Sequence, residues 1–212
     1  MLHGRGAMTR GDEMPRAIDF YFDFSSPYGY LASTRIDAVA ARHGRAVRWR
    51  PYMLGVVYKS TGYHPLEQEP KRRYMMHDVA RCARLLGVPF RVPQRFPAAL
   101  LAASRAVYWI EDRDPRQAAA FAKACFAAYW QEDRDLAEAA VVAEIAAAQG
   151  VLAAELRIAL EAPAVKARLK EETEAAIAAG VFGSPFILVD GEPFWGADRL
   201  DQVDRWLATG GW

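Results

Sequence analysis

Strand-forming segments occur only near the two ends of this chain, and a long helical stretch separates them. Residues 17–24 (AIDFYFDF) and 186–190 (FILVD) are rich in aromatic and β-branched residues, and 46–51 (AVRWRP) alternate in polarity. From Pro70 to Gly180 the apolar residues recur near every 3.6 positions, which is typical of amphipathic helices. A sheet built from these strands must therefore join the two ends of the chain around a helical insertion.

The first half of the expected sheet has the order strand, helix, strand. Ser26 followed by Pro27 is a strong helix start, because proline is favoured at the first helical position. Apolar residues at helical spacing then predict a helix from Tyr28 to His43, which Gly44 ends. The strands on either side of this helix are expected to run parallel.

The remaining elements complete an α/β fold: a thioredoxin-like domain (βαβ…ββα) with a large all-helical insertion. A short turn at Asp190-Gly191 joins the last two strands. We expect a disordered leader at 1–16, the thioredoxin-like domain at 17–60 and 181–212, and the inserted helical domain at 61–180. The expected helices lie at 71–86, 97–111, 115–130, 136–148, 152–161, 164–179 and 198–208.

Charge and composition exclude several classes of function. The chain has 27 Lys and Arg and 26 Asp and Glu residues, interleaved, so it lacks the basic stripe that nucleic-acid binding requires. No apolar run approaches the roughly 20 residues that span a bilayer, and the leader has no hydrophobic segment of a signal peptide. We therefore expect a cytoplasmic protein with no nucleic-acid or membrane partner.

The two cysteines give no sign of redox or metal chemistry. Cys82 and Cys125 are far apart, lie in helix-like segments and form no Cys-x-x-Cys motif. Free cysteines in such positions usually behave as small buried hydrophobes. We expect neither a disulfide nor a metal site.

Ser26 lies where the first predicted strand is followed directly by the start of a helix. Unpaired backbone N–H groups at a helix start favour an anion such as a thiolate, and a hydroxyl there can also donate to it. A serine before a proline is equally well an ordinary helix cap. The residues alone leave both interpretations open.

Two further segments are candidates for ligand contacts. Ser184-Pro185 immediately precedes an internal strand, where a cis bond is plausible and the backbone of the preceding residue can pair with an extended peptide. An ordinary turn proline is the alternative. Asp198 stands at the start of the last helix, where it could cap the helix or accept a hydrogen bond from a ligand ammonium group.

Several motifs occur in a characteristic order: Asp23-Phe24-x-Ser26-Pro27-x-x-Tyr30-Leu31-Ala32, Arg50-Pro51 with Leu54-Gly55, Tyr74…Asp78…Arg81, Gly87-Val88-Pro89-Phe90, Gly180-Val181-Phe182-Gly183-x-Pro185 and Phe194-Trp195-Gly196-x-Asp198-Arg199-Leu200. Over about residues 17–208 the chain resembles the 2-hydroxychromene-2-carboxylate isomerases. These enzymes are kin of the kappa-class glutathione transferases, in the DsbA-like branch of thioredoxin folds.

The resemblance implies glutathione as cofactor and a small aromatic keto acid as substrate, in a homodimeric enzyme of aromatic hydrocarbon catabolism. It implies that Ser26 is the catalytic residue and hydrogen-bonds the glutathione sulfur. The other residues that it assigns to glutathione are Lys71, Ser184, Pro185, Ala197, Asp198 and Arg199. Lys59 and Phe96 are expected to face the second substrate, although Lys59 and Lys71 on the residues alone are ordinary surface cations.

Where redox relatives carry Cys-x-x-Cys, this chain has Ser26-Pro27-Tyr28-Gly29, so the reactive thiol must come from the ligand. This favours glutathione chemistry over disulfide exchange. The resemblance implies an isomerase that interconverts 2-hydroxychromene-2-carboxylate and trans-o-hydroxybenzylidenepyruvate, which we expect to proceed through reversible thiolate addition. A kappa-like transferase and a silent glutathione-binding protein remain alternatives, and a thiol-disulfide oxidoreductase is disfavoured. The family's usual asparagines are replaced by Tyr63 and Ala99, which suggests a more apolar acceptor.

Overall fold

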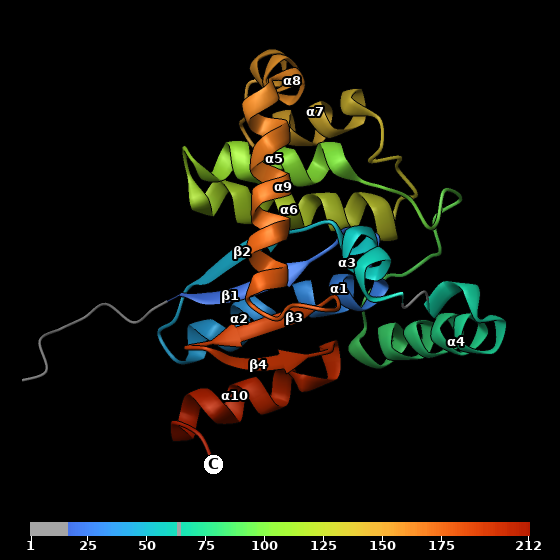
Figure 1. Cartoon of the computed structure of the whole chain (residues 1–212), viewed down its shortest axis with the longest axis vertical. Coiled ribbons are helices and arrows are strands. Elements are labelled where there is room, and N and C mark those ends of the chain that lie inside the picture. Colours follow the sequence, from blue (N-terminus) through green and yellow to red (C-terminus); the bar gives the residue numbers. More distant parts are fainter. Residues whose placement is uncertain (1–16, 63–64) are drawn as a thin grey trace, which may run out of the picture.

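The computed structural model describes residues 17–62 and 65–212, so the expected leader and Tyr63 lie outside the described residues. A four-stranded sheet joins the two ends of the chain, in the strand order β2-β1-β3-β4 (Figure 1). β1 and β2 pair in parallel, as predicted, whereas β1 with β3 and β3 with β4 are antiparallel. The strands are β1 (Ile18–Phe22), β2 (Val47–Pro51), β3 (Phe186–Val189) and β4 (Glu192–Trp195).

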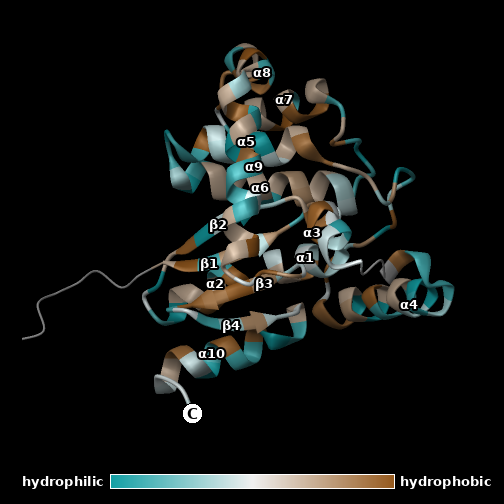
Figure 2. Ribbon diagram, viewed as in Figure 1, coloured by the Kyte–Doolittle hydropathy of each residue, from teal (hydrophilic) through white to brown (hydrophobic). Residues whose placement is uncertain are grey.

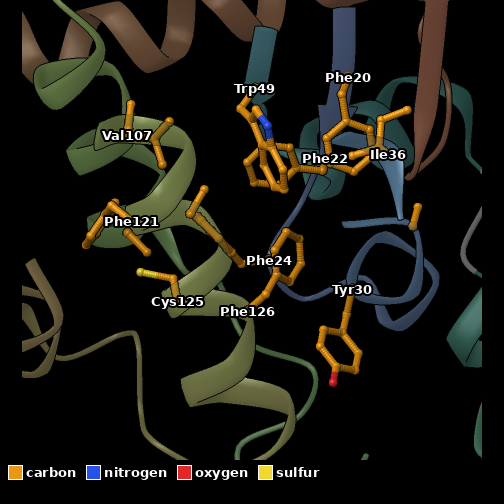
Figure 3. Packing of buried hydrophobic residues seen from close by; sticks show 14 of the residues in the cluster. Phe20, Phe22, Phe24, Tyr30, Ile36, Trp49, Val107, Phe121, Cys125 and Phe126 are labelled. Carbon is orange, nitrogen blue, oxygen red and sulfur yellow. The ribbon is translucent and has the colours of Figure 1, made fainter. Parts of the chain in front are cut away.

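Alternation along β1 divides its side chains between two cores. Phe20 and Phe22 are fully buried on one face, where they pack edge-on against Trp49 of β2. Phe126 of the helical region meets the ring of Phe22 on this face (Figure 3). Tyr21 points to the opposite face and joins a separate cluster with Phe186. The strand is therefore internal and covered on both sides.

The segment expected to form one helix over 28–43 forms two, α1 (Pro27–Ser33) and α2 (Ile36–Arg42). The Ser33 and Thr34 hydroxyls donate to the carbonyls of Tyr30 and Leu31. Serine and threonine compete in this way with the backbone bonds of a helix. Arg35 follows with φ −124° and interrupts the helical backbone.

A short helix, α3 (Leu54–Thr61), follows β2, and the sequence did not predict it. Its valines, serine and threonine are weak helix formers. Lys59 lies in the last turn of this helix and is exposed there. A single 3-10 turn, η1 (Pro65–Glu67), then leads to α4.

Most helices of the region from Pro70 to Gly180 lie close to the bounds that the spacing of apolar residues predicted. α6 has the predicted bounds, because the Asp114 carboxylate caps it and Pro115 occupies its first position. The helix expected from residue 97 begins only at Leu101, after a segment that offers no side-chain cap. The helices are α4 (Glu69–Leu86), α5 (Leu101–Glu111), α6 (Pro115–Trp130), α7 (Ala139–Ala148), α8 (Ala153–Glu161) and α9 (Pro163–Ala178).

Helices cover both faces of the sheet: Phe126 of α6 packs in the cluster of Phe20 and Phe22, whereas Ala176 of α9 packs in the cluster of Tyr21. In Figure 1, α5 to α8 lie above the sheet, α9 runs down from them onto it, and α4 extends to one side. α10 (Leu200–Thr209) lies below β4 and packs against α2. Figure 2 shows that β3 is hydrophobic along its length, whereas α10 alternates between hydrophobic and hydrophilic residues. The mixed sheet with its helical layer is the α/β arrangement that the sequence predicted.

Candidate functional site

Ser26 is the cap of α1 and lies at the end of the loop that follows β1. Its hydroxyl accepts a hydrogen bond from the Gly29 N–H at 3.0 Å and donates one to the Ser184 carbonyl at 2.8 Å. The residue is only 5% exposed. α1 is only seven residues long. The positive potential at its start therefore comes from the N–H groups of the first turn rather than from the dipole of a long helix.

The Ser184–Pro185 peptide bond is cis, as the sequence analysis anticipated. The Ser184 hydroxyl accepts a hydrogen bond from the Asp23 N–H at 3.0 Å, so the turn is tied to the β1–α1 junction by a second contact. The reason is topological: antiparallel pairing sets Tyr21 opposite Phe186 and brings the end of β1 beside the start of β3. Residues 158 positions apart thus meet in one place.

Gly29 is required by this close approach. A Cβ atom at Gly29 would lie 3.0 Å from the Ser184 hydroxyl and 3.1 Å from the Ser26 Cβ. Both distances are tighter than ordinary van der Waals contact. The fourth position of the Ser26-Pro27-Tyr28-Gly29 segment is therefore occupied by the one residue that leaves the two serines undisturbed.

Asp23 lies behind this junction and was not singled out from the sequence. Its carboxylate accepts hydrogen bonds from the Ser25 N–H at 2.8 Å, the Ser25 hydroxyl at 2.6 Å and the Leu54 N–H at 3.0 Å. Burial raises the pKa of Asp23, although the hydrogen bonds from Ser25 and Leu54 oppose this shift. The family motif contained the residue, but only the fold shows which groups it holds.

Ala197, Asp198 and Arg199 form a 3-10 turn, η2 (Ala197–Arg199), which follows β4 and lies against α1. The Asp198 side chain is 73% exposed and pairs with Arg199 at 3.0 Å. Neither η2 nor α10 has a side-chain cap, so the alternative in which Asp198 caps the last helix is wrong. The carboxylate is instead presented to solvent beside α1.

α4 is joined to α1 by a polar contact. The Tyr28 hydroxyl donates to the Asp78 carboxylate at 2.8 Å, and Arg81 pairs with the same carboxylate. Burial and the Asp78 contact raise the pKa of Tyr28. Although burial opposes the shift, hydrogen bonds from Tyr28 and Arg81 lower the pKa of Asp78. The Tyr74…Asp78…Arg81 stretch of the sequence was thus a usable signal for this contact.

The two lysines of the expected site lie on neighbouring helices. Lys59 is exposed in the last turn of α3, and Lys71 is exposed in the first turn of α4. The side-chain hydrogen bonds of Ser26 go to Gly29 and Ser184, so neither lysine is a direct partner of Ser26. The helices that carry the lysines, α3 and α4, lie beside the Ser26 region: Asp23 bonds to the start of α3, and Tyr28 of α1 bonds to Asp78 of α4.

Phe96 is partly buried, and its ring packs against Trp130 at 5.4 Å. The Trp130 indole N–H donates to the Phe24 carbonyl, two residues before Ser26. Phe96 also borders a hollow of about 440 Å³. The hollow is lined by Gln94, Arg95, Phe96, Pro97, Ala98, Ala99 and Ala137.

Trp195 lies on the other side of the cis-proline turn. Its indole is 52% exposed and meets the Phe182 ring at 4.9 Å. A Cβ atom at Gly183 would collide with this indole. Trp195 therefore covers the backbone immediately before Ser184.

Neither cysteine belongs to this centre, and both are free thiols. Cys125 is buried beside Phe126 in the core (Figure 3), and burial raises its pKa. Cys82 is partly buried, with its sulfur 3.8 Å from Asp78, and burial raises its pKa too. Within residues 17–62 and 65–212, no group of side chains forms a metal site and no helix is long and apolar enough to cross a membrane.

The family model of the DSBA-like thioredoxin domain matches residues 17–208. A 2-hydroxychromene-2-carboxylate isomerase of Sphingobium xenophagum is 32% identical over 197 residues, which cover 92% of this chain and 99% of the relative. Glutathione S-transferase kappa 1 of Homo sapiens is 26% identical, with 92% and 94% covered.

Solved structures of two kinds of protein, an isomerase and a DsbA-like protein, have folds similar to that of this chain. A 2-hydroxychromene-2-carboxylate isomerase structure superposes with a TM-score of 0.83 at 29% identity, covering 91% of this chain and 94% of the other. A probable DsbA oxidoreductase of Streptomyces coelicolor superposes with a TM-score of 0.74 at 19% identity, covering 91% of this chain and 88% of the other. At this identity the similarity shows a shared fold and no shared function.

Proposed function

Because the chain belongs to the DsbA-like thioredoxin family, among the 2-hydroxychromene-2-carboxylate isomerases, we propose that it is a glutathione-dependent isomerase. The reaction interconverts 2-hydroxychromene-2-carboxylate and trans-o-hydroxybenzylidenepyruvate, or a closely related aromatic keto acid. The observation that carries this proposal is the pair of hydrogen bonds that the Ser26 hydroxyl makes at the β1–α1 junction. A cytoplasmic homodimer in aromatic hydrocarbon catabolism is part of the same proposal.

The residues of the junction fit a bound glutathione. The Ser26 hydroxyl can turn from the Ser184 carbonyl toward a sulfur atom, which leaves that carbonyl as an acceptor for a peptide N–H. β3 begins at Phe186, so the backbone of Ser184 lies just before the strand and outside the pairing of the sheet. One hydrogen bond is exchanged for two, and no buried group is left without a partner.

The other proposed contacts lie around this junction. The exposed Asp198 carboxylate, with Ala197 and Arg199, suits the ammonium end of the tripeptide, and Lys71 suits a carboxylate. Lys59 would offset the negative charge of the keto acid, and Phe96 would face its aromatic ring. When bound, glutathione would supply a thiolate that adds reversibly to the unsaturated keto acid, so that rotation about a single bond becomes possible.

Ser26 has a defined part in this chemistry. It donates a hydrogen bond that stabilises the thiolate form of the cofactor, and the Gly29 N–H holds the serine oxygen in place. The protein supplies no nucleophile of its own at the site, because the segment Ser26-Pro27-Tyr28-Gly29 contains no cysteine. This separates the proposed reaction from disulfide exchange, which needs a protein thiolate.

An ultraviolet assay with 2-hydroxychromene-2-carboxylate, run with and without glutathione, tests the proposal. The wild-type protein should convert the substrate only when glutathione is present. Ser26→Ala should lower kcat/KM by roughly 10- to 100-fold, because a hydrogen bond to a charged acceptor is worth about 1.5–3 kcal/mol. Ser33→Ala removes another α1 hydroxyl of equal exposure and should leave turnover intact.

Conversion that is independent of glutathione would contradict the cofactor, and equal turnover in Ser26→Ala and wild type would remove Ser26 from the mechanism. A kappa-like transferase is the second candidate, since kappa relatives match over most of this chain. The two functions differ in the fate of the adduct. A transferase accumulates a glutathione conjugate, whereas an isomerase regenerates free glutathione in full.

A further inference from the structure

Asp23 makes contact with three segments at the Ser26 junction. Its carbonyl accepts a hydrogen bond from the Ser26 N–H at 2.9 Å, and its own N–H donates to the Ser184 hydroxyl. One carboxylate oxygen, Oδ1, accepts from both the N–H and the hydroxyl of Ser25. The other, Oδ2, accepts from the Leu54 N–H at 3.0 Å. One residue thus links α1, the cis-proline turn and α3.

The contact with Leu54 matters most, because α3 has no cap of its own. Met53 occupies the cap position and offers no side-chain acceptor. The first N–H groups of any helix need an acceptor from elsewhere. Here Thr173 of α9 accepts from the Met53 N–H at 3.1 Å, and Asp23 accepts from the Leu54 N–H. The start of α3 is therefore held by two side chains that are distant in sequence.

The same helix carries Lys59 in its last turn. A change in the direction of this short helix would move Lys59 relative to Ser26. Asp23 is the residue that bonds to the first turn of α3 while also bonding to the Ser26 N–H. The helix that carries Lys59 is thus bonded at its start to a carboxylate next to the Ser26 junction.

We propose that Asp23 is a positioning residue that fixes α3, and with it Lys59, relative to the Ser26 centre. The proposal rests on the proposed function for the role of Lys59 toward a substrate carboxylate. A carboxylate suits the task because it has only acceptor positions. The three groups that contact it, two backbone N–H groups and the Ser25 hydroxyl, are all donors.

The first experiment measures amide hydrogen exchange in α3 and does not depend on activity. Asp23→Ala should accelerate exchange of the α3 amides by about 10- to 100-fold, because a hydrogen bond to a charged group is lost. Asp19→Ala is the matched control, since Asp19 lies on β1 and pairs with Arg50 instead of α3. Unchanged exchange in α3, or equal acceleration in both variants, would overturn the proposal.

The second experiment is a double-mutant cycle on the KM for the keto acid. Lys59→Met should raise this KM by about tenfold in the wild-type background and by only about twofold in Asp23→Ala. The effect is smaller in Asp23→Ala because a misplaced lysine contributes little to keto-acid binding. Glutathione affinity should change much less than the keto-acid KM in both backgrounds. An additive cycle, with the same effect of Lys59→Met in both backgrounds, would overturn the proposal.

If Asp23→Ala fails to fold, Leu54→Pro removes the other partner of the same hydrogen bond. Proline is favoured at the first position of a helix, so it removes the N–H without breaking α3. Leu54→Ala controls for the lost leucine side chain. Leu54→Pro should weaken the effect of Lys59→Met where Leu54→Ala does not, and the same effect in both would overturn the proposal. Absence of isomerase activity in the wild-type protein would instead end the proposed function, and the exchange experiment would still decide whether Asp23 holds α3.

Discussion

Ser26 serves the fold and the proposed chemistry with a single hydroxyl. The same oxygen that accepts from the Gly29 N–H is the one whose proton is directed at the Ser184 carbonyl. The two native thiols, Cys82 and Cys125, lie elsewhere, and burial raises the pKa of both. The chemistry of position 26 can therefore be probed without interference from the rest of the chain.

Ser26→Cys is expected to give a thiol with a pKa below the ordinary value of about 8.5, because first-turn N–H groups favour a thiolate. Oxidised glutathione should then form a mixed disulfide at this residue and release one glutathione thiolate, which intact mass spectrometry detects. The wild-type protein should stay unmodified and is the control. A thiol of ordinary pKa that forms no adduct would argue against an anion-stabilising position at the start of α1.

At the scale of elements, a polar contact holds α4 against α1. Tyr28 of α1 donates to Asp78 of α4, and α4 carries Lys71 in its first turn. Tyr30 of the same helix α1 makes a comparable contact, because its hydroxyl donates to the Pro89 carbonyl and accepts from Gln131. The two tyrosines differ in whether their partner lies on α4, the helix that carries Lys71.

Tyr28→Phe should lower the free energy of unfolding by about 1 kcal/mol and weaken glutathione binding several-fold, because the position of α4 is loosened. Tyr30→Phe should cost similar stability but leave glutathione affinity unchanged. Urea denaturation and titration calorimetry measure the two effects separately. Equal glutathione affinity in the two variants would show that the Tyr28–Asp78 contact does not serve the site.

At the scale of the whole molecule, a partly buried ion pair connects the sheet to the helical region. Arg50 of β2 pairs with Glu172 of α9 at 3.3 Å, and their side chains are only 13% and 12% exposed. Arg168 pairs with the same carboxylate at 3.0 Å. The inserted helical domain at 61–180 stays a prediction. The contact of Arg50 with Glu172 joins α9, which lies in this range, directly to the sheet.

Glu172→Gln should lower the free energy of unfolding by about 3 kcal/mol, because it removes the carboxylate that Arg50 and Arg168 share in a partly buried place. Arg50 keeps its longer ion pair with Asp19 at 3.6 Å. Glu174→Gln on the same helix is the control and should change stability by at most about 0.5 kcal/mol, since that side chain is exposed. Equal losses from the two substitutions, measured by urea denaturation, would contradict a role for the buried pair in joining the layers.

Local sequence patterns predicted much of this protein. The strands, the bounds of α6, the Ser26-Pro27 junction and the Ser184-Pro185 turn follow from residues within a few positions of one another. The missed features have local causes that are individually weak. The break between α1 and α2 depends on two hydroxyls that compete for backbone carbonyls, and α3 forms from poor helix formers.

By itself, the sequence determined the order of elements and the replacement of a cysteine by Ser26, because propensity, capping and composition act over short distances. Only the tertiary structure decided that Ser26 meets Ser184, that Tyr28 meets Asp78 and that Asp23 holds the start of α3. These contacts join residues far apart in the chain. They arise because antiparallel pairing of β1 with β3 and the packing of α3 and α4 bring those residues together, which no local pattern encodes.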